Sequence, residues 1–327
     1  MTLMFSLSVN MSAQWWSMND FHEGLAVVEN DKDLWGFIDK TGKLAIPCKW
    51  NDAKDFSDGM SAVRDKSNQW GFIDKTGKLA IPCKWKSVYD FREGLAMVED
   101  QNGKRSFIDK LGQVVFPCTW KFANQFFEGL SCVYDESSKH GYINKQGKLV
   151  IPCKWIGAEK FSNGLACVKD ESRKYGFIDK TGKLMIPCKW KYASTFSDGL
   201  ALVQDDSGKY GFIDKTGNVV IPCTWKGANS FREGLACVRD NNGKCGFIDK
   251  TGKLVIPCKW NGMGEFHEGM ASVEDNNNNQ GYIDKTGKLV IPCKWEYAYD
   301  FSDGWARVQP NMDETGFFIN KSGQKMK

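Results

Sequence analysis

A block of fifteen residues returns every 35 positions along this chain, and this fixed period limits the possible folds more than any other feature. One copy reads GFIDKTGKLAIPCKW and covers residues 36–50. A constant period of this length indicates repeated units that bury their apolar side chains against their neighbours. We therefore expect residues 15–327 to form one repeat array rather than two or three globular domains. The Pro-Cys pair of the block begins at Pro47, Pro82, Pro117, Pro152, Pro187, Pro222, Pro257 and Pro292.

Each unit contains three short segments with β-strand character. In the first unit these are residues 25–28, 35–39 and 43–47. The polar residues 30–33 join the first two segments, as in a β-hairpin. Residues 40–42 join the last two, and their glycine suits the left-handed position of a three-residue loop. Each unit is predicted to be a three-stranded antiparallel meander.

The residues after the third strand connect one unit to the next. Pro47 cannot donate a hydrogen bond to a strand ladder, so the strand should end there. Trp50, Ala53 and Phe56 follow at three-residue spacing, which predicts one helical or 3₁₀ turn with these side chains on one side. We expect the Trp and the Phe to pack the units together; the alternative is an exposed Trp ladder for sugar rings or lipid. These structural residues are Trp50, Trp85, Trp120, Trp155, Trp190, Trp225, Trp260 and Trp295, with Phe56, Phe91 and their equivalents.

Two positions in each unit, and the polar hairpin turn, vary more than the rest. The position before the first Gly of the block ranges from Trp to Arg, Cys and Gln, which predicts that it is at least partly exposed. The other position follows the linker Trp by two residues. Variable positions on a regular scaffold commonly form its contact surface. The candidate binding residues are Trp35, Trp70, His140, Tyr175 and Tyr210 at the first position and Phe122, Tyr192 and Tyr297 at the second.

Composition and charge argue against several classes of function. The net charge is +4 and Lys alternates with Asp inside every unit, which indicates a solvated face and not the basic block of a nucleic-acid site. No apolar run approaches the ~20 residues that span a bilayer. The three histidines have no Ser or Cys partner that distinguishes one unit from the others, and a catalytic centre needs a unique constellation. We expect no enzyme activity and no cofactor.

The chain has twelve cysteines, and eight of them follow the repeated proline. Equivalent residues of adjacent units should be ~10 to 14 Å apart, whereas a disulfide needs Cα atoms within ~7 Å. There is also no CxxC motif or paired His for a zinc site. Most of the thiols are expected to be free and buried, as small apolar side chains are.

Residues 1–14 lie outside the repeat. They are apolar and end in Ser12-Ala13-Gln14, which resembles the cleavage site of a signal peptide and predicts export to the periplasm or cell surface. The alternative is a capping extension of a cytoplasmic protein, which the free thiols favour. At the other end, the last unit is truncated and its third strand is polar, as suits a terminal cap.

The repeat resembles the WG-repeat family of bacterial proteins, also called KWG repeats. The resemblance rests on residues 35–43, on Ile46-Pro47 and on residues 56–63, and it covers residues 21–327. It implies a β-rich array with interaction roles and no shared catalytic activity, so no functional residues are carried over. This chain departs from the pattern where the Trp of Trp-Gly is lost in seven of nine copies and where Ser106 replaces the Gly.

These observations predict an all-β protein in which the units stack into an open superhelical solenoid. A closed, propeller-like ring is the alternative. The predicted function is a non-catalytic scaffold that binds a protein or a glycan through its variable hairpin turns. A structural protein that associates with itself end to end is the second possibility.

Overall fold

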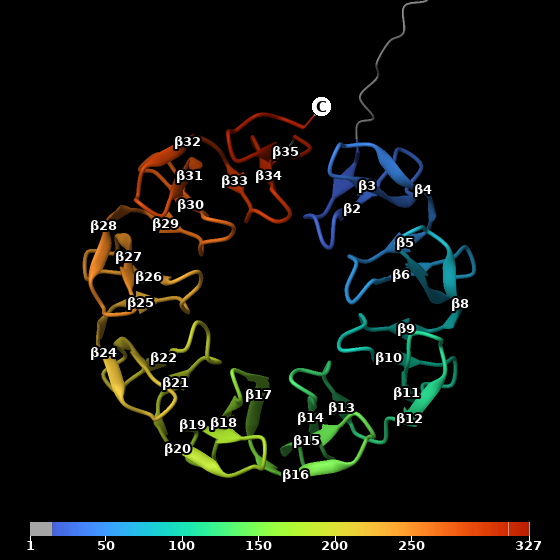
Figure 1. The fold of residues 1–327 in the computed structure, drawn as a ribbon, viewed down its shortest axis with the longest axis horizontal. Helices are drawn as coiled ribbons and strands as arrows, with labels where there is room; N and C mark the ends of the chain where they lie inside the picture. The colour runs from blue at the N-terminus through green and yellow to red at the C-terminus, as the bar shows by residue number, and fades with distance from the viewer. Residues whose placement is uncertain (1–14, 313, 327) are drawn as a thin grey trace, which may run out of the picture.

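A computed structural model describes residues 15–312 and 314–326, and it is a closed ring of nine small antiparallel sheets, which we call blades (Figure 1). The predicted all-β array of antiparallel repeat units is confirmed; its open superhelical form is wrong, and the alternative of a propeller-like ring is confirmed. All regular structure in the described residues is β-strand, and none of it is a helix able to cross a bilayer. The possible signal peptide at residues 1–14 lies outside the described residues.

The strands of each blade follow one another in sequence, from the centre of the ring to its circumference (Figure 1). Blades 1 to 3 comprise β1 (Ser17–Met18), β2 (Leu25–Glu29), β3 (Trp35–Asp39), β4 (Leu44–Trp50); β5 (Asp52–Ala53), β6 (Met60–Arg64), β7 (Trp70–Asp74), β8 (Leu79–Trp85); and β9 (Ser87–Val88), β10 (Ala96–Glu99), β11 (Arg105–Ile108), β12 (Val114–Pro117). Blades 4 to 6 comprise β13 (Phe122–Ala123), β14 (Leu130–Tyr134), β15 (His140–Asn144), β16 (Leu149–Trp155); β17 (Gly157–Ser162), β18 (Leu165–Lys169), β19 (Tyr175–Asp179), β20 (Leu184–Trp190); and β21 (Tyr192–Ala193), β22 (Ala201–Gln204), β23 (Tyr210–Ile213), β24 (Val219–Trp225). Blades 7 to 9 comprise β25 (Gly227–Ala228), β26 (Leu235–Arg239), β27 (Cys245–Asp249), β28 (Leu254–Trp260); β29 (Gly262–Met263), β30 (Met270–Glu274), β31 (Gln280–Asp284), β32 (Leu289–Trp295); and β33 (Tyr297–Ala298), β34 (Trp305–Gln309), β35 (Phe317–Asn320).

Eight blades have four strands, one more than the predicted meander. The extra strand is innermost and comes from the linker, where a helical turn was expected. In blade 2, for example, Ala53 pairs with Val63. The expectation of a helical turn is wrong because an extended linker can place its backbone hydrogen bonds on the edge of the next sheet.

The predicted turn between the third and fourth strands is confirmed. Gly42 has a φ of 82°, in the left-handed region. The Asp39 carboxylate accepts hydrogen bonds from the Thr41 amide at 2.8 Å and from the Thr41 hydroxyl at 2.6 Å. The Thr41 hydroxyl is the main reason why the pKa of Asp39 is lowered.

The outer strand does not end at the proline. Strand β4 continues through Pro47 to Trp50, and β4 pairs only with β3, so the missing donor faces the open edge of the sheet. The ladder contains a bulge opposite Gly36. A Cβ atom at Gly36 would lie 2.6 Å from the Ile46 carbonyl oxygen, which explains why glycine recurs there.

Blade 3 departs from this pattern because Ser106 occupies the glycine position. Ser106 pairs directly with Pro117, and β12 ends at Pro117 instead of reaching Trp120. Phe116 also replaces the isoleucine of the other outer strands. Blade 3 is therefore the least regular of the four-stranded blades.

The hydrophobic core consists of separate clusters at the seams between neighbouring blades. At the seam between blades 1 and 2, Trp50, Phe56 and Phe37 belong to one buried cluster, and the two Phe rings are 5.0 Å apart. Phe91 is buried in the same way at the next seam. The linker tryptophans are buried at Trp50, Trp85, Trp155, Trp190 and Trp295 and half-buried at Trp120, Trp225 and Trp260.

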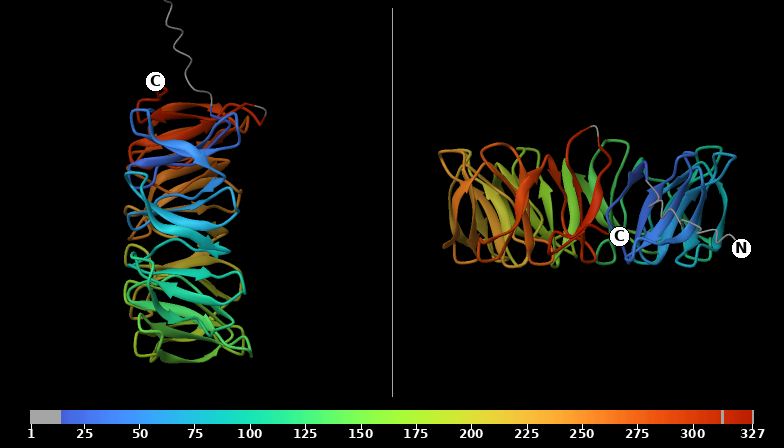
Figure 2. Two further views of the ribbon diagram at one scale, coloured as in Figure 1. Left: turned by 90° about the vertical axis from the view of Figure 1, so that its right-hand side faces the viewer. Right: turned by 90° about the horizontal axis from the view of Figure 1, so that it is seen from above.

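Blade 9 packs directly against blade 1 and closes the ring, so the two ends of the described chain lie together (Figure 2). The rings of Phe318 and Phe21 are 4.8 Å apart. The Ser302 hydroxyl donates to the Phe21 carbonyl at 2.6 Å. Ser57 makes the same bond to Phe91 within the ring, so the closing seam repeats an internal one.

The twelve cysteines are all free. The four outside the Pro-Cys position are buried, but the eight repeated cysteines are half-buried. The expectation that most thiols are buried is therefore wrong for the repeated position. That position lies on the outer strand, where the blades diverge toward the circumference.

Candidate interaction surfaces

The antiparallel strands give the ring two different faces. One face, which we call the carboxylate face, carries the inner loops such as residues 54–59 and the turns such as residues 40–42. The opposite face, which we call the hairpin face, carries the turns such as residues 30–34 and the linker residues 51–52. Loops project at both ends of the ring in the side view (Figure 2).

A circular network of charges joins the inner loops on the carboxylate face. Asp58 illustrates it: one carboxylate oxygen accepts a hydrogen bond from the Gly94 amide at 2.6 Å, and the other lies 2.9 Å from the Lys110 ammonium. Both partners belong to the next blade. Burial would raise the pKa of Asp58, but these bonds outweigh it and the pKa is lowered. The network therefore stabilises the ionised carboxylate.

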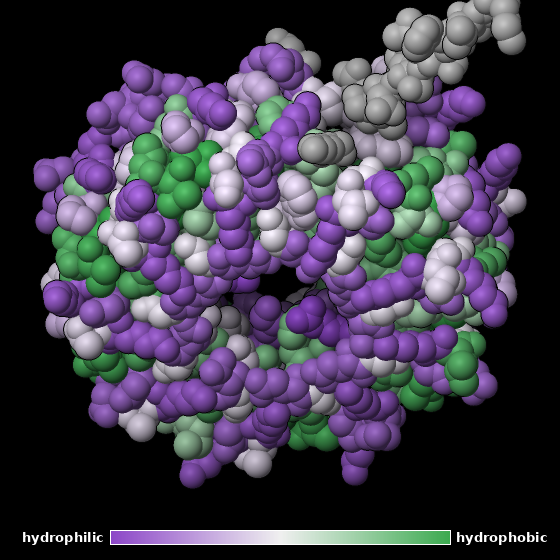
Figure 3. Space-filling model, turned by 45° about the horizontal axis from the view of Figure 1, so that its top comes forward, coloured by the Kyte–Doolittle hydropathy of each residue, from purple (hydrophilic) through white to green (hydrophobic). Residues whose placement is uncertain are grey.

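Equivalent contacts recur around the ring, including the closing seam. The amide bond occurs at eight acidic residues: Glu23, Asp58, Glu93, Glu128, Asp198, Glu233, Glu268 and Asp303. Seven of them, all except Asp198, also form the lysine ion pair at 2.8 to 3.1 Å. Polar side chains surround the central opening in the space-filling view (Figure 3). These carboxylates are not among the residues predicted from sequence to bind, although an acidic residue precedes the inner-loop Gly in every unit but one.

A second set of carboxylates precedes the repeated Phe in five neighbouring blades: Glu265, Asp300, Asp20, Asp55 and Asp90. Desolvation raises the pKa of Asp20 and of Asp90. Asp20 lies 3.8 Å from Arg307, and Asp55 lies 3.5 Å from His22. Among the described residues, the side chain of Asp90 has no ion-pair or hydrogen-bond partner.

The hairpin face is held together by contacts between successive turns. The Lys209 ammonium donates to the Asn241 amide oxygen at 2.6 Å, and Lys244 donates to Asn276 at 2.9 Å. Lys139 pairs with Glu171 in the same way. Together with the Lys174–Asp206 pair, these contacts link the hairpin turns of blades 4 to 8.

The structure brings the two variable positions together on the hairpin face. The rings of Tyr175 in blade 5 and Tyr192 in blade 6 are 5.8 Å apart. In blade 4, Tyr134 stacks on Phe122 at 5.3 Å and contacts His140 at 5.3 Å. Aromatic side chains from the ends of different strands therefore form shared patches.

The individual candidates differ in exposure. Tyr192 is 41% exposed. The other candidates are half-buried: Trp35, Trp70, His140, Tyr175, Tyr210, Phe122 and Tyr297. Four of them also pack against the hydrophobic clusters at the seams, namely Trp35, Trp70, Tyr175 and Tyr210. Cys245 occupies the first variable position but is only 2% exposed, so the expectation of exposure is wrong in blade 7.

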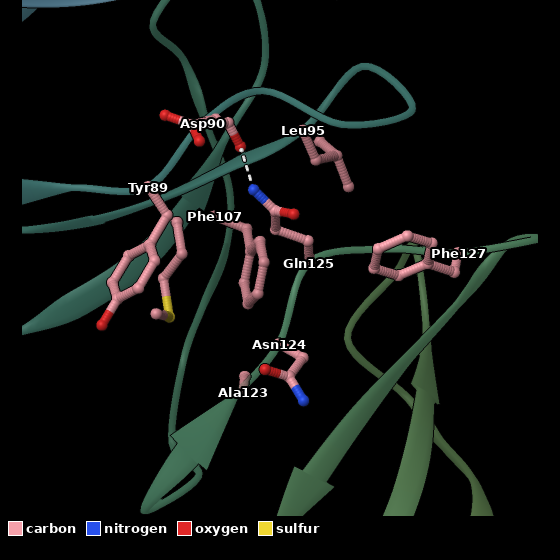
Figure 4. A pocket seen from close by; sticks show the side chains of 9 residues that line it. Tyr89, Asp90, Leu95, Phe107, Ala123, Asn124, Gln125 and Phe127 are labelled. Atoms are coloured by element: carbon pink, nitrogen blue, oxygen red, sulfur yellow. Dashed lines mark hydrogen bonds between the residues drawn. The ribbon is translucent and has the colours of Figure 1, made fainter. Parts of the chain in front are cut away.

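A cavity of about 310 Å³ lies between blades 3 and 4 (Figure 4). Its lining is largely apolar and includes Leu95, Phe107 and Phe127. The Gln125 amide donates to the Asp90 carbonyl at 3.3 Å across this seam. The cavity adjoins the irregular blade 3. No group of three or more His, Cys, Asp or Glu side chains that could hold a metal ion occurs in the described parts of the chain.

The repeats match a family model described as WG containing repeat in eight segments: residues 35–68, 70–104, 106–136, 141–172, 175–209, 210–245, 246–278 and 281–311. The chain belongs to the WG-repeat family. No curated protein sequence matches it. This WG-repeat chain is similar in fold to a solved structure described as the crystal structure of the eukaryotic initiation factor, with a TM-score of 0.62, 11% identity and coverage of 92% of this chain and 94% of that chain. The computationally designed Ika8 protein matches with a TM-score of 0.46 and 10% identity over 84% of this chain and 93% of its own.

Proposed function

We propose that this WG-repeat ring is a non-catalytic scaffold that binds a protein through its hairpin face. The observation that carries the proposal is the contact between Tyr175 and Tyr192, because it joins the two variable positions of neighbouring blades in one aromatic patch. Aromatic side chains surrounded by polar groups are typical of the energetically dominant part of protein interfaces. The membership of a repeat family supports a scaffold role.

A protein partner fits this face better than a glycan. Tyr175 is half-buried, and the Lys169 ammonium covers its ring at 4.9 Å from the ring centre. The ring is therefore not a free, flat platform for a sugar. The charged turns around the patch can instead form the polar rim of a protein interface.

The test is quantitative cross-linking to proteins of the native host, followed by mass spectrometry. A double variant, Tyr175→Ala with Tyr192→Ala, should lose the partner that the unchanged chain captures. Leu111→Ala is the matched control, since Leu111 is 77% exposed in a turn of the opposite face. Equal capture by both variants, or binding of the unchanged chain to a glycan array alone, would contradict the proposal.

The closed ring does not favour the alternative of end-to-end self-association. Blade 9 already packs against blade 1, so neither terminal blade has a free seam. We expect a monomer at all concentrations in light scattering. A mass that grows with concentration would favour self-association instead.

A further inference from the structure

The network on the carboxylate face contains one vacated position. In eight blades the acidic residue before the inner-loop glycine binds the next blade, as Asp58 binds Gly94 and Lys110. In blade 5 the equivalent residue is Asn163. Its amide nitrogen lies 3.4 Å from the Phe196 carbonyl and 3.2 Å from the Ser162 hydroxyl. Asn163 therefore directs its amide donor to its neighbour Ser162 and to a carbonyl of blade 6, and it supplies no carboxylate to that blade.

Blade 6 keeps both groups that would hold that carboxylate. The Gly199 amide and the Lys215 ammonium correspond to Gly94 and Lys110. Neither has a hydrogen-bond or ion-pair partner in the described residues, whereas every other inner-loop glycine donates its amide to a carboxylate. An amide donor and an ammonium thus occupy the repeat positions that hold a carboxylate elsewhere in the same ring.

The vacated position is accessible from outside, since Lys215 is exposed and Gly199 is half-buried. Asn163, but neither Gly199 nor Lys215, also lines a hollow of about 880 Å³ on the carboxylate face. Lys160 and Arg92 also line this hollow, and neither forms an ion pair among the described residues; both cover the Phe127 ring, at 4.7 and 4.3 Å from its centre. The same lining also carries the carboxylates of Glu23, Asp58, Glu93 and Glu128, so the hollow has no net positive charge and an anion must be held by Gly199 and Lys215 themselves.

We propose that the position between blades 5 and 6 binds a carboxylate group from outside the chain, with Gly199 donating its amide hydrogen and Lys215 supplying the counter-charge. The seven complete positions of the same ring show which ligand this pair of groups accepts. A carboxylate has two oxygens, so it can satisfy both donors at once, as Asp58 does. The group can belong to a free small acid or to an Asp or Glu side chain of a partner.

The first experiment is a titration of the isotope-labelled full chain with sodium acetate at constant ionic strength, followed by the amide resonance of Gly199. The expected result is a saturating shift with a dissociation constant at or above about 1 mM, because a ligand of four heavy atoms gains little binding energy. Gly234 is the internal control, since its amide is already bonded to Asp198 at 2.7 Å. Its resonance should not respond.

Two variants test the assignment. Asn163→Asp restores the carboxylate of the other blades and should abolish the response to acetate while the ring remains folded. Lys215→Gln should weaken binding about two- to fivefold, as expected for an exposed ion pair. A Gly199 response that persists unchanged in Asn163→Asp, or an equal response to chloride, would overturn the proposal, and so would the absence of a saturating response in the unchanged chain.

The source of the carboxylate is assigned with a blocked peptide. Acetyl-Gly-Glu-Gly-amide should bind at least as tightly as acetate if the position receives an acidic side chain. Weaker binding of the peptide than of acetate would assign the position to a free small acid. The matched peptide with Gln in place of Glu should not bind in either case, and its binding would contradict the proposal.

Discussion

The seams on the two sides of blade 4 differ in one substitution pattern and in how tightly they pack. Toward blade 5, Trp155 is 8% exposed in a closed cluster. Toward blade 3, Trp120 is half-buried, and a cavity of about 310 Å³ opens beside the seam. The irregular seam belongs to the blade in which Ser106 replaces the repeated glycine. The comparison teaches that the serine goes with a looser seam, but also that the glycine alone does not bury the Trp, because Trp225 and Trp260 are half-buried in blades that keep it.

The largest expected difference concerns these two tryptophans. Trp155→Ala should lower the free energy of unfolding by about 3 to 5 kcal/mol, the usual cost of truncating a large buried aromatic side chain. Trp120→Ala should cost about half as much, because less of the indole is removed from water on folding. Urea unfolding followed by circular dichroism measures both. Equal losses would show that the two seams contribute equally and would break the comparison.

The role of the glycine is tested by giving blade 4 the serine of blade 3 and by giving blade 3 the glycine of the other blades. Gly141→Ser introduces a Cβ atom 2.5 Å from the Ile151 carbonyl oxygen and should destabilise the ring by about 1 to 3 kcal/mol. The reverse change in blade 3, Ser106→Gly combined with Phe116→Ile, should stabilise it by up to about 1 kcal/mol. Thermal unfolding of both variants gives the comparison. Destabilisation by both changes would mean that blade 3 is adapted to its serine.

The closing seam, between blades 9 and 1, extends the comparison to two blades that no linker connects. Burial alone would raise the pKa of Asp303, but its bonds to Lys40 and to the Gly24 amide outweigh this effect, and the pKa is lowered from 3.8. The resulting stabilisation is present above the unfolded pKa of 3.8 and is lost as the pH falls through the lower folded value. The unfolding temperature should therefore begin to fall below about pH 4.

Asp303→Asn should lower the unfolding temperature at pH 7 slightly. It should also make the unfolding temperature depend less on pH below about pH 4. The expected cost is below about 1 kcal/mol, since the pair is partly exposed. Asp31→Asn is the control because Asp31 is exposed in a hairpin turn. If Asp31→Asn changed the dependence of the unfolding temperature on acid pH as much as Asp303→Asn does, the closing ion pair would have no special role.

The repeat units were predictable from sequence because glycine and proline mark their boundaries. Gly42 occupies the left-handed turn position that its place between two β-prone segments predicts. The inner strand Asp52–Ala53 was not predictable, since two residues leave no periodic signal. Closure was not predictable either, because it depends on the small angle between neighbouring sheets, summed over the whole ring.

The candidate site was predictable only in part. Variation along the repeat pointed to Tyr175 and Tyr192, but their contact connects residues of different blades. The carboxylate network escaped notice because its charges are nearly constant and resemble a solvated face. Its partners are separated by 36 and 52 residues, as for Asp58 with Gly94 and Lys110, and the packing of neighbouring blades brings them together.

The proline in each outer strand has a consequence for the behaviour of the ring in concentrated solution. Leu44 is 47% exposed and lies three residues before Pro47, on a strand whose outward side pairs with nothing in the described chain. Such an apolar edge would ordinarily recruit a foreign strand and start aggregation. Pro47 offers no hydrogen there, and the charged Lys43 and Lys49 stand on either side of it. The circumference is thus protected against amyloid-like growth at every complete blade.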